Sequence, residues 1–210
     1  MFRVTDKIRS TENSVGSKVK NVNSEAIAKA IEEVERAYER NKLTDHVYGV
    51  RSGASPIAPW PTEPCKILFL DFDGVLNSER SANQTGNRYK FAKDSIAALN
   101  MVLQLTEARI VVTSSWRESW TLIENAAFLE NAGIVKGRVV GKTAVLENKE
   151  RGSDIDSWLR SAPYAIKSFA ILDDRDDMAT HKHRLVRIDP KIGLTMELAN
   201  RVIDLLSENG

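Results

Sequence analysis

The run Ile67-Leu68-Phe69-Leu70-Asp71-Phe72-Asp73-Gly74 places four consecutive apolar residues directly before two aspartates and a glycine. Four apolar residues in a row are typical of a short strand buried on both faces of a parallel sheet. Further apolar runs and segments with helical apolar spacing alternate after it, at 92–107, 110–113, 118–132, 138–140, 169–172, 185–188 and 195–206. This alternation predicts an α/β fold, a Rossmann-like parallel sheet with helices on both faces.

The composition is that of an ordinary globular protein. The 210 residues are 42% hydrophobic and 28% charged, with a formal net charge of +1, so no global field points to nucleic acid or membrane, although a local basic patch is compatible with it. The single cysteine, Cys65, excludes an internal disulfide and a cysteine-built zinc site. Since neither a signal peptide nor a membrane-spanning run is evident, we expect a cytoplasmic protein with no membrane partner.

Two parts are expected along the chain. Residues 1–64 form an N-terminal extension, in which helical apolar spacing predicts a helix over 24–41 and four of the six prolines mark 56–64 as an extended linker. The apolar stripe of that helix must be buried, either on the main domain or in a homodimer contact. The catalytic domain is expected over 65–210.

Polar residues follow three of the predicted strands, at 71–74, 114–117 and 173–177. Ligands of open parallel sheets bind beyond the carboxyl ends of the strands, so these residues should meet in one crevice. Several carboxylates in one small site repel one another unless a cation is present, and oxygen ligands without a cysteine or histidine cluster favour Mg²⁺. Asp71, Asp174 and the backbone carbonyl of Asp73 would suffice as ligands, with Asp173 either ligating directly or orienting the others.

A carboxylate beside a metal ion can attack phosphorus and form an aspartyl phosphate, which water then hydrolyses. Asp71 is the predicted nucleophile. Asp73 is placed to protonate the leaving oxygen and then to accept a proton from the attacking water. Gly74 permits the chain to turn away without obstructing the phosphate.

Other residues are candidates for binding the phosphorylated substrate. Ser114 can donate to a phosphate oxygen, and Arg151 is the leading candidate for the balancing cation, with Lys149 second. Ser115 either contacts phosphate or caps a helix, and Arg117 either reaches phosphate or forms an ion pair.

Further polar and aromatic residues have two interpretations each. The loop at 87–90, with Arg88 and Tyr89, has the basic and aromatic character of a nucleic acid contact, or is a plain surface loop. Trp116, Trp120 and Trp158 are expected in the core, with base-stacking platforms as the alternative, and Asp176 and Asp177 are expected to begin a helix. Ser153 or Asp154 is expected to cap the helix before the third strand.

Four of these segments, in this order, resemble the motifs of the haloacid dehalogenase (HAD) superfamily: 71–77, Ser114, Arg151 and Asp173-Asp174. The runs 114–117, 151–159 and 193–195 are similar to the HAD domain of Swiss-army-knife RNA repair proteins. The chain also resembles the phosphatase half of polynucleotide kinase-phosphatase, but it has no phosphate-binding loop of a kinase. The second motif can also be registered on Thr113, and the third has arginine where lysine is more common.

The resemblance implies a Mg²⁺-dependent phosphatase. Dehalogenase members lack the second aspartate, so Asp73 favours phosphoester hydrolysis. The intervals between motifs, 78–113 and 118–150, are too short for a large lid, so we expect a minimal cap or none and a site open to bulky substrates. The expected substrate is a nucleic acid end, such as a 3′-phosphate, or a nucleotide. The rivals are a small-metabolite or protein phosphatase and a catalytically silent binding module.

Overall fold

The computed structural model describes residues 59, 61–147 and 150–208. Its centre is a five-stranded sheet with the strand order β3-β2-β1-β4-β5, in which all neighbours pair in parallel. The strands are β1 (Cys65–Leu70), β2 (Arg109–Val112), β3 (Val139–Lys142), β4 (Ile166–Asp173) and β5 (Leu185–Arg187). The predicted α/β parallel sheet is confirmed.

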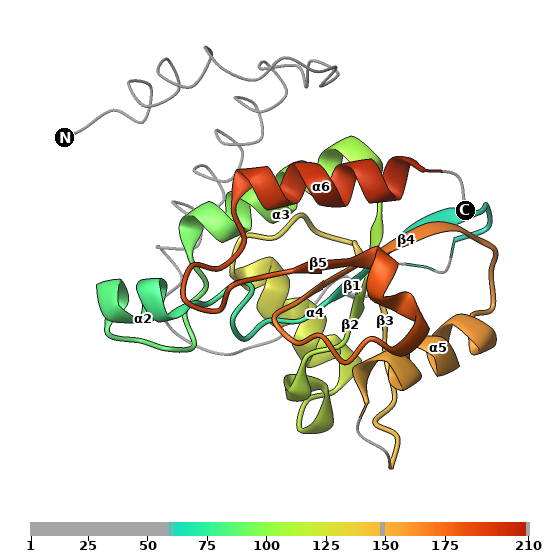
Figure 1. Ribbon diagram of the computed structural model, residues 1–210, viewed down its shortest axis with the longest axis horizontal. Coiled ribbons are helices and arrows are strands. Elements are labelled where there is room, and N and C mark those ends of the chain that lie inside the picture. Colours follow the sequence, from blue (N-terminus) through green and yellow to red (C-terminus); the bar gives the residue numbers. More distant parts are fainter. Residues whose placement is uncertain (1–58, 60, 148–149, 209–210) are drawn as a thin grey trace.

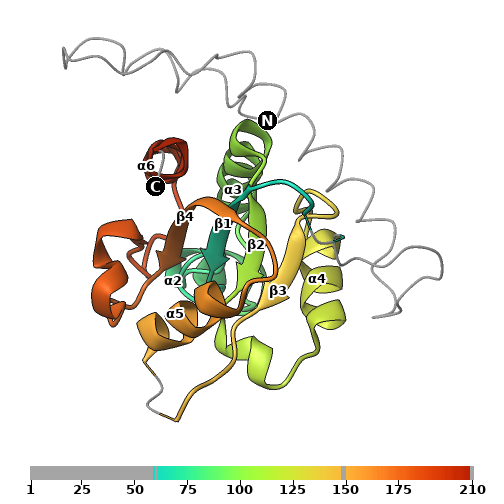
Figure 2. The ribbon, with the colours of Figure 1, turned by 90° about the vertical axis from the view of Figure 1, so that its right-hand side faces the viewer.

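Helices cover both faces of this sheet (Figures 1 and 2). The α-helices are α2 (Glu79–Thr85), α3 (Lys93–Thr106), α4 (Leu122–Asn131), α5 (Arg151–Ser161) and α6 (Met196–Ser207), and two short 3₁₀ helices are η2 (Ser115–Glu118) and η3 (Ala179–Arg184). Side chains of α3, α4 and α6 pack in one apolar cluster, whereas those of α5 pack in another on the opposite face. Between β1 and β2 the chain forms only α2 and α3, which agrees with a minimal cap.

The central strand β1 contributes to both clusters because successive side chains of a strand point to opposite faces. Leu68 and Leu70 belong to the cluster with α3 and α6, and Ile67 and Phe69 to the cluster with α5. All four are fully buried, which explains why this strand is continuously apolar.

Two predictions about helix boundaries are wrong, and Asp177 explains both. No α-helix begins at 173–177, because the segment is a loop that leads to η3. Asp177 instead caps α5, since its carboxylate accepts from Arg151 N at 3.1 Å and its carbonyl from Gly152 N at 3.0 Å. The helix therefore begins at Arg151, before the predicted caps Ser153 and Asp154.

The helix predicted over 24–41 lies outside the described residues, as do residues 56–58 and 60 of the predicted linker, so the homodimer contact stays a prediction. β1 begins at Cys65, directly after the last proline of that stretch. Within the described ranges, no helix has the length and apolar character required to cross a membrane.

Candidate active site

Three carboxylates meet at the carboxyl ends of the two central strands. Asp71 follows β1, Asp173 ends β4 and Asp174 follows it, and one oxygen of each lies within 4.8 Å of the others. The register Leu70↔Leu172 and the hydrogen bond from Asp71 N to Leu172 O (3.0 Å) bring these positions together. The cluster is therefore a direct consequence of the parallel pairing of β1 and β4.

The cluster is buried and short of positive charge. Asp71 is 4% and Asp173 0% exposed, and burial raises the pKa of both carboxyls, that of Asp173 to about 7. The charge of Asp71 adds to the rise in the pKa of Asp173. Arg151 opposes these shifts, with Nη2 3.6 Å from Asp71 Oδ1 and Nε 2.9 Å from Asp173 Oδ2.

This donor set fits a hard divalent cation. It consists of oxygens only, and burial together with the neighbouring carboxylate charges raises the pKa of Asp71 and Asp173, an effect that a bound cation would oppose. Asp71 and Asp174 are the carboxylates best placed as ligands. Asp173 is already engaged, since Oδ1 accepts from Arg175 N at 3.0 Å and Oδ2 faces Arg151, which suits an orienting role.

Adding Mg²⁺ to the metal-free protein is expected to raise its melting temperature, because the cation binds the folded carboxylate cluster and not the unfolded chain. At 100 times Kd the stabilisation is about 2.7 kcal/mol, or roughly 5–10 °C for a chain of this size. Thermal melts with Mg²⁺ and with a chelator measure it. Asp174→Asn should lose the shift and Asp94→Asn, at an exposed position, should retain it. A midpoint independent of Mg²⁺ would contradict the metal site.

Asp73 is exposed, and both oxygens of its carboxylate accept hydrogen bonds. Asn77 Nδ2 donates to Oδ1 and Trp116 Nε1 donates to Oδ2, each at 2.8 Å. Asn77 Oδ1 also accepts from Gly74 N at 3.1 Å. The carboxylate of Asp73 is thus held in one orientation beside the acidic cluster.

Gly74 has a role beyond the predicted one. Its φ of 77° lies in the left-handed region, and a Cβ there would come within 2.9 Å of Asp174 Oδ2 and of Pro190 Cβ. Glycine therefore permits the loops after β1 and β4 to approach closely enough to bring Asp174 to the cluster.

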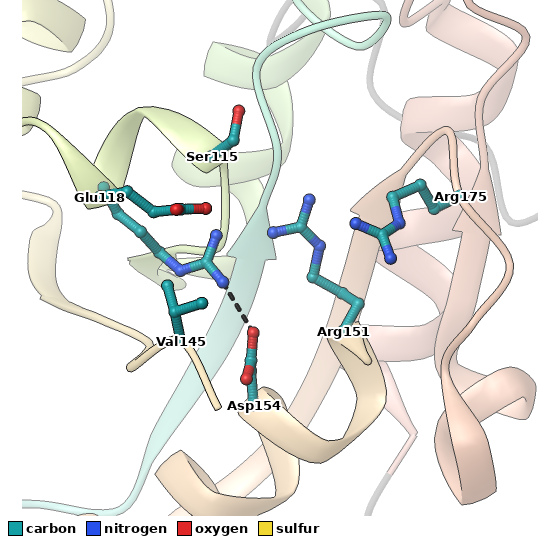
Figure 3. A pocket seen from close by; sticks show the side chains of 7 residues that line it. Ser115, Glu118, Val145, Arg151, Asp154 and Arg175 are labelled. Carbon is teal, nitrogen blue, oxygen red and sulfur yellow. Dashed lines mark hydrogen bonds and ion pairs between the residues drawn. The ribbon is translucent and has the colours of Figure 1, made fainter. Parts of the chain in front are cut away.

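A pocket of about 110 Å³ lies beside the cluster. Figure 3 shows Ser115 and Glu118 reaching it from η2, Arg151 and Asp154 from α5, and Arg175 from the loop after β4. The predicted residues Ser115 and Arg151 are brought together here. Arg175 was not predicted, because its position in an acidic loop gives no sequence signal for a pocket residue.

The hydroxyl groups of Thr113 and Ser114 are buried at the end of β2. The Ser114 hydroxyl lies beside Asp71 and lowers its pKa. Neither hydroxyl makes a well-aligned hydrogen bond within the described residues, so both are suited to receive a ligand. The contact with Asp71 favours Ser114 over Thr113 as the residue of the second motif.

Arg117 takes the second of its two predicted roles. Its guanidinium forms a buried ion pair with Asp154 at 2.7 Å and donates from Nη1 to Ser114 O at 2.9 Å. It also lines the pocket, so a contact with substrate phosphate stays a prediction. Arg88 does not line the pocket and lies over the ring of Tyr89, and Lys149 is outside the described residues.

Sequence reasoning missed the two side chains that hold Asp73. Trp116 packs against the core, as expected, but it is only half-buried and its indole N–H also donates to Asp73 across 43 positions in the chain. No local pattern reveals that contact. Asn77 lies four residues from Asp73 in the same turn, so turn chemistry gave some signal for it.

A family model described as the HAD domain in Swiss Army Knife RNA repair proteins matches residues 67–199. The chain belongs to this family. The match includes the residues after β1, β2 and β4 and the start of α5, so the HAD resemblance is confirmed, and this HAD domain is a hydrolase of the phosphatase type. Comparisons with curated proteins and with solved structures found no match.

Proposed function

We propose that this HAD domain is a Mg²⁺-dependent phosphomonoesterase that forms an aspartyl phosphate on Asp71 and acts on a nucleic acid end, such as a 3′-phosphate, or on a nucleotide. The observation that carries the proposal is the convergence of Asp71, Asp173 and Asp174 beside Arg151. The RNA repair proteins in the family description and the small size of the insert between β1 and β2 support the substrate class.

The proposed reaction has two displacements at phosphorus. In the first, Asp71 forms a bond to phosphorus while the bond to the leaving oxygen breaks, and Asp73 gives that oxygen its proton. In the second, water attacks the aspartyl phosphate, Asp73 takes a proton from that water, and inorganic phosphate leaves Asp71. Both carboxylates return to their starting states.

The remaining residues bind and orient the phosphoryl group. Arg151 and Ser114 donate to its oxygens, and Asp173 holds the guanidinium of Arg151 in place. Asp71, Asp174 and the carbonyl of Asp73 would hold Mg²⁺, which would supply charge neutralisation between the carboxylate and the phosphate.

A substrate panel tests this function. Phosphate release is measured from 3′-phosphorylated and 5′-phosphorylated oligonucleotides, mononucleotides, glycerol phosphate and a phosphopeptide, with Mg²⁺ or with a chelator. We expect Mg²⁺-dependent release that is fastest from an oligonucleotide end or a nucleotide. A preference for glycerol phosphate or the phosphopeptide would contradict the substrate class, and no turnover of any substrate would favour a binding module.

Asp73→Asn is expected to lower kcat/KM by roughly 10²–10⁴-fold for an alkyl phosphate, because an amide cannot protonate the leaving oxygen. The loss should be much smaller for p-nitrophenyl phosphate, whose leaving group needs little protonation. Rates on both substrates, with Asp189→Asn as an exposed control, provide the comparison. Equal losses on the two substrates would contradict the proton-transfer role.

A further inference from the structure

An exposed aromatic ring lies next to the proposed proton donor. Tyr89, in the loop between α2 and α3 (Figure 1), is 57% exposed, and its ring centre is 6.1 Å from that of Trp116. Trp116 packs in turn on Trp120 at 5.0 Å and Phe128 at 5.1 Å. Tyr89 therefore stands at the solvent end of a packed aromatic cluster and is supported by it.

A ring contact and hydrogen bonds from Trp116 and Asn77 connect the loop that carries this ring to Asp73. Trp116, which contacts the Tyr89 ring, donates from Nε1 to Asp73 Oδ2 at 2.8 Å. Asn77 donates from Nδ2 both to Asp73 Oδ1 at 2.8 Å and to Arg88 O at 2.9 Å, directly before Tyr89. These contacts hold the loop of Tyr89 close to Asp73, the proposed proton donor to the leaving oxygen.

The surface also carries positive charge. The guanidinium carbon of Arg88 lies 5.4 Å from the centre of the Tyr89 ring. Lys90, which follows Tyr89 in the sequence, is exposed. Since Asp73 is the proposed donor to the leaving oxygen, the group bonded to that oxygen should lie near Asp73, on the side of the site that Trp116 and Tyr89 line. An exposed aromatic ring with a cation over one of its faces matches a nucleotide, whose base can stack on the ring and whose next phosphate is anionic.

We propose that the exposed ring of Tyr89, supported by Trp116, is a stacking surface for the base of the terminal nucleotide in a single-stranded nucleic acid end, with Arg88 facing the next phosphate. The inference rests on the proposed phosphatase function and specifies that the leaving group carries a nucleotide base. A single strand is required because the faces of a paired and stacked base are covered in a duplex. A small alkyl phosphate makes no use of this surface.

Binding to the Asp71→Asn protein tests the stacking surface without turnover. Fluorescence anisotropy in Mg²⁺ compares two 5′-labelled, 3′-phosphorylated single strands, one with an intact terminal base and one with an abasic terminal residue. We expect the intact strand to bind about tenfold more tightly, within the roughly five- to hundredfold range of base–aromatic stacking. Tyr89→Ala should remove this difference, whereas Tyr89→Phe and Lys90→Ala should retain it.

The stacking surface is overturned if the two strands bind with equal affinity or if neither binds. It is also overturned if the difference in affinity between the strands survives Tyr89→Ala, or if a phosphotyrosine peptide binds more tightly than the intact strand. Phosphate release from the same strands by the unmutated protein tests the proposed function separately. Release without a base preference in binding overturns the stacking surface alone. Base-dependent binding without release supports the surface and overturns the phosphatase assignment.

Discussion

Asp71→Asn is expected to abolish phosphate release, with kcat lowered by at least about 10³-fold on every substrate that the unmutated protein hydrolyses. The asparagine amide has nearly the same shape as the carboxylate but is not a nucleophile toward phosphorus. It also lacks the charge that a cation requires, so the Mg²⁺-dependent rise in melting temperature should shrink together with the rate. Single-turnover measurements with a radiolabelled phosphate detect any residual aspartyl phosphate.

The fold of this variant should be intact, and its metal-free stability should be equal or higher. Burial raises the pKa of Asp71, and the charge of Asp71 raises the pKa of Asp173, so an uncharged residue at position 71 removes an unfavourable buried charge. Asp94→Asn, which alters an exposed aspartate paired with Arg80, is the matched control and should keep the full rate. An active Asp71→Asn protein would overturn the nucleophile assignment.

The sheet could be predicted from sequence because a strand buried on both faces is a run of consecutive apolar residues. The four consecutive apolar residues of β1 are buried by clusters on both faces, and their pattern alone indicates a central strand. The sequence places Arg151 at the opening of α5, as the structure has it, but it does not reveal the capping residue Asp177, which lies after the next strand. A capping residue that is distant in the sequence, as Asp177 is from Arg151, cannot be identified from the residues next to the helix.

The same distinction applies to the site. Asp71, Asp73, Asp173 and Asp174 follow predicted strands, so topology alone brings them to one edge of the sheet. The support around them depends on side-chain geometry between distant segments, as in the bond from Trp116 to Asp73. From the sequence, Arg117 was expected either to contact substrate phosphate or to form an ion pair. The structure shows the ion pair, whose partner Asp154 lies in α5.

That ion pair leads to the largest expected effect on stability. Asp154→Ala should lower the free energy of unfolding by about 3–5 kcal/mol, because it leaves the guanidinium of Arg117 charged, buried and without its carboxylate. The side chains of Arg117 and Asp154 are 4% and 3% exposed, so the unpaired guanidinium would stay largely shielded from solvent. The loss is a large part of the 5–15 kcal/mol that stabilises a typical domain. Urea unfolding in the presence of a chelator measures it without a contribution from Mg²⁺.

Asp156→Ala is the matched control, since Asp156 lies in the same helix and pairs with Arg160 at the surface, where the expected cost is below about 1 kcal/mol. The double substitution Arg117→Met with Asp154→Leu removes both charges and should recover most of the loss. A cost below about 1 kcal/mol for Asp154→Ala would contradict the importance of the pair. Because Arg117 also donates to Ser114 O, the pair joins the end of β2 to the helix of Arg151, and Asp154→Ala should weaken phosphate binding as well.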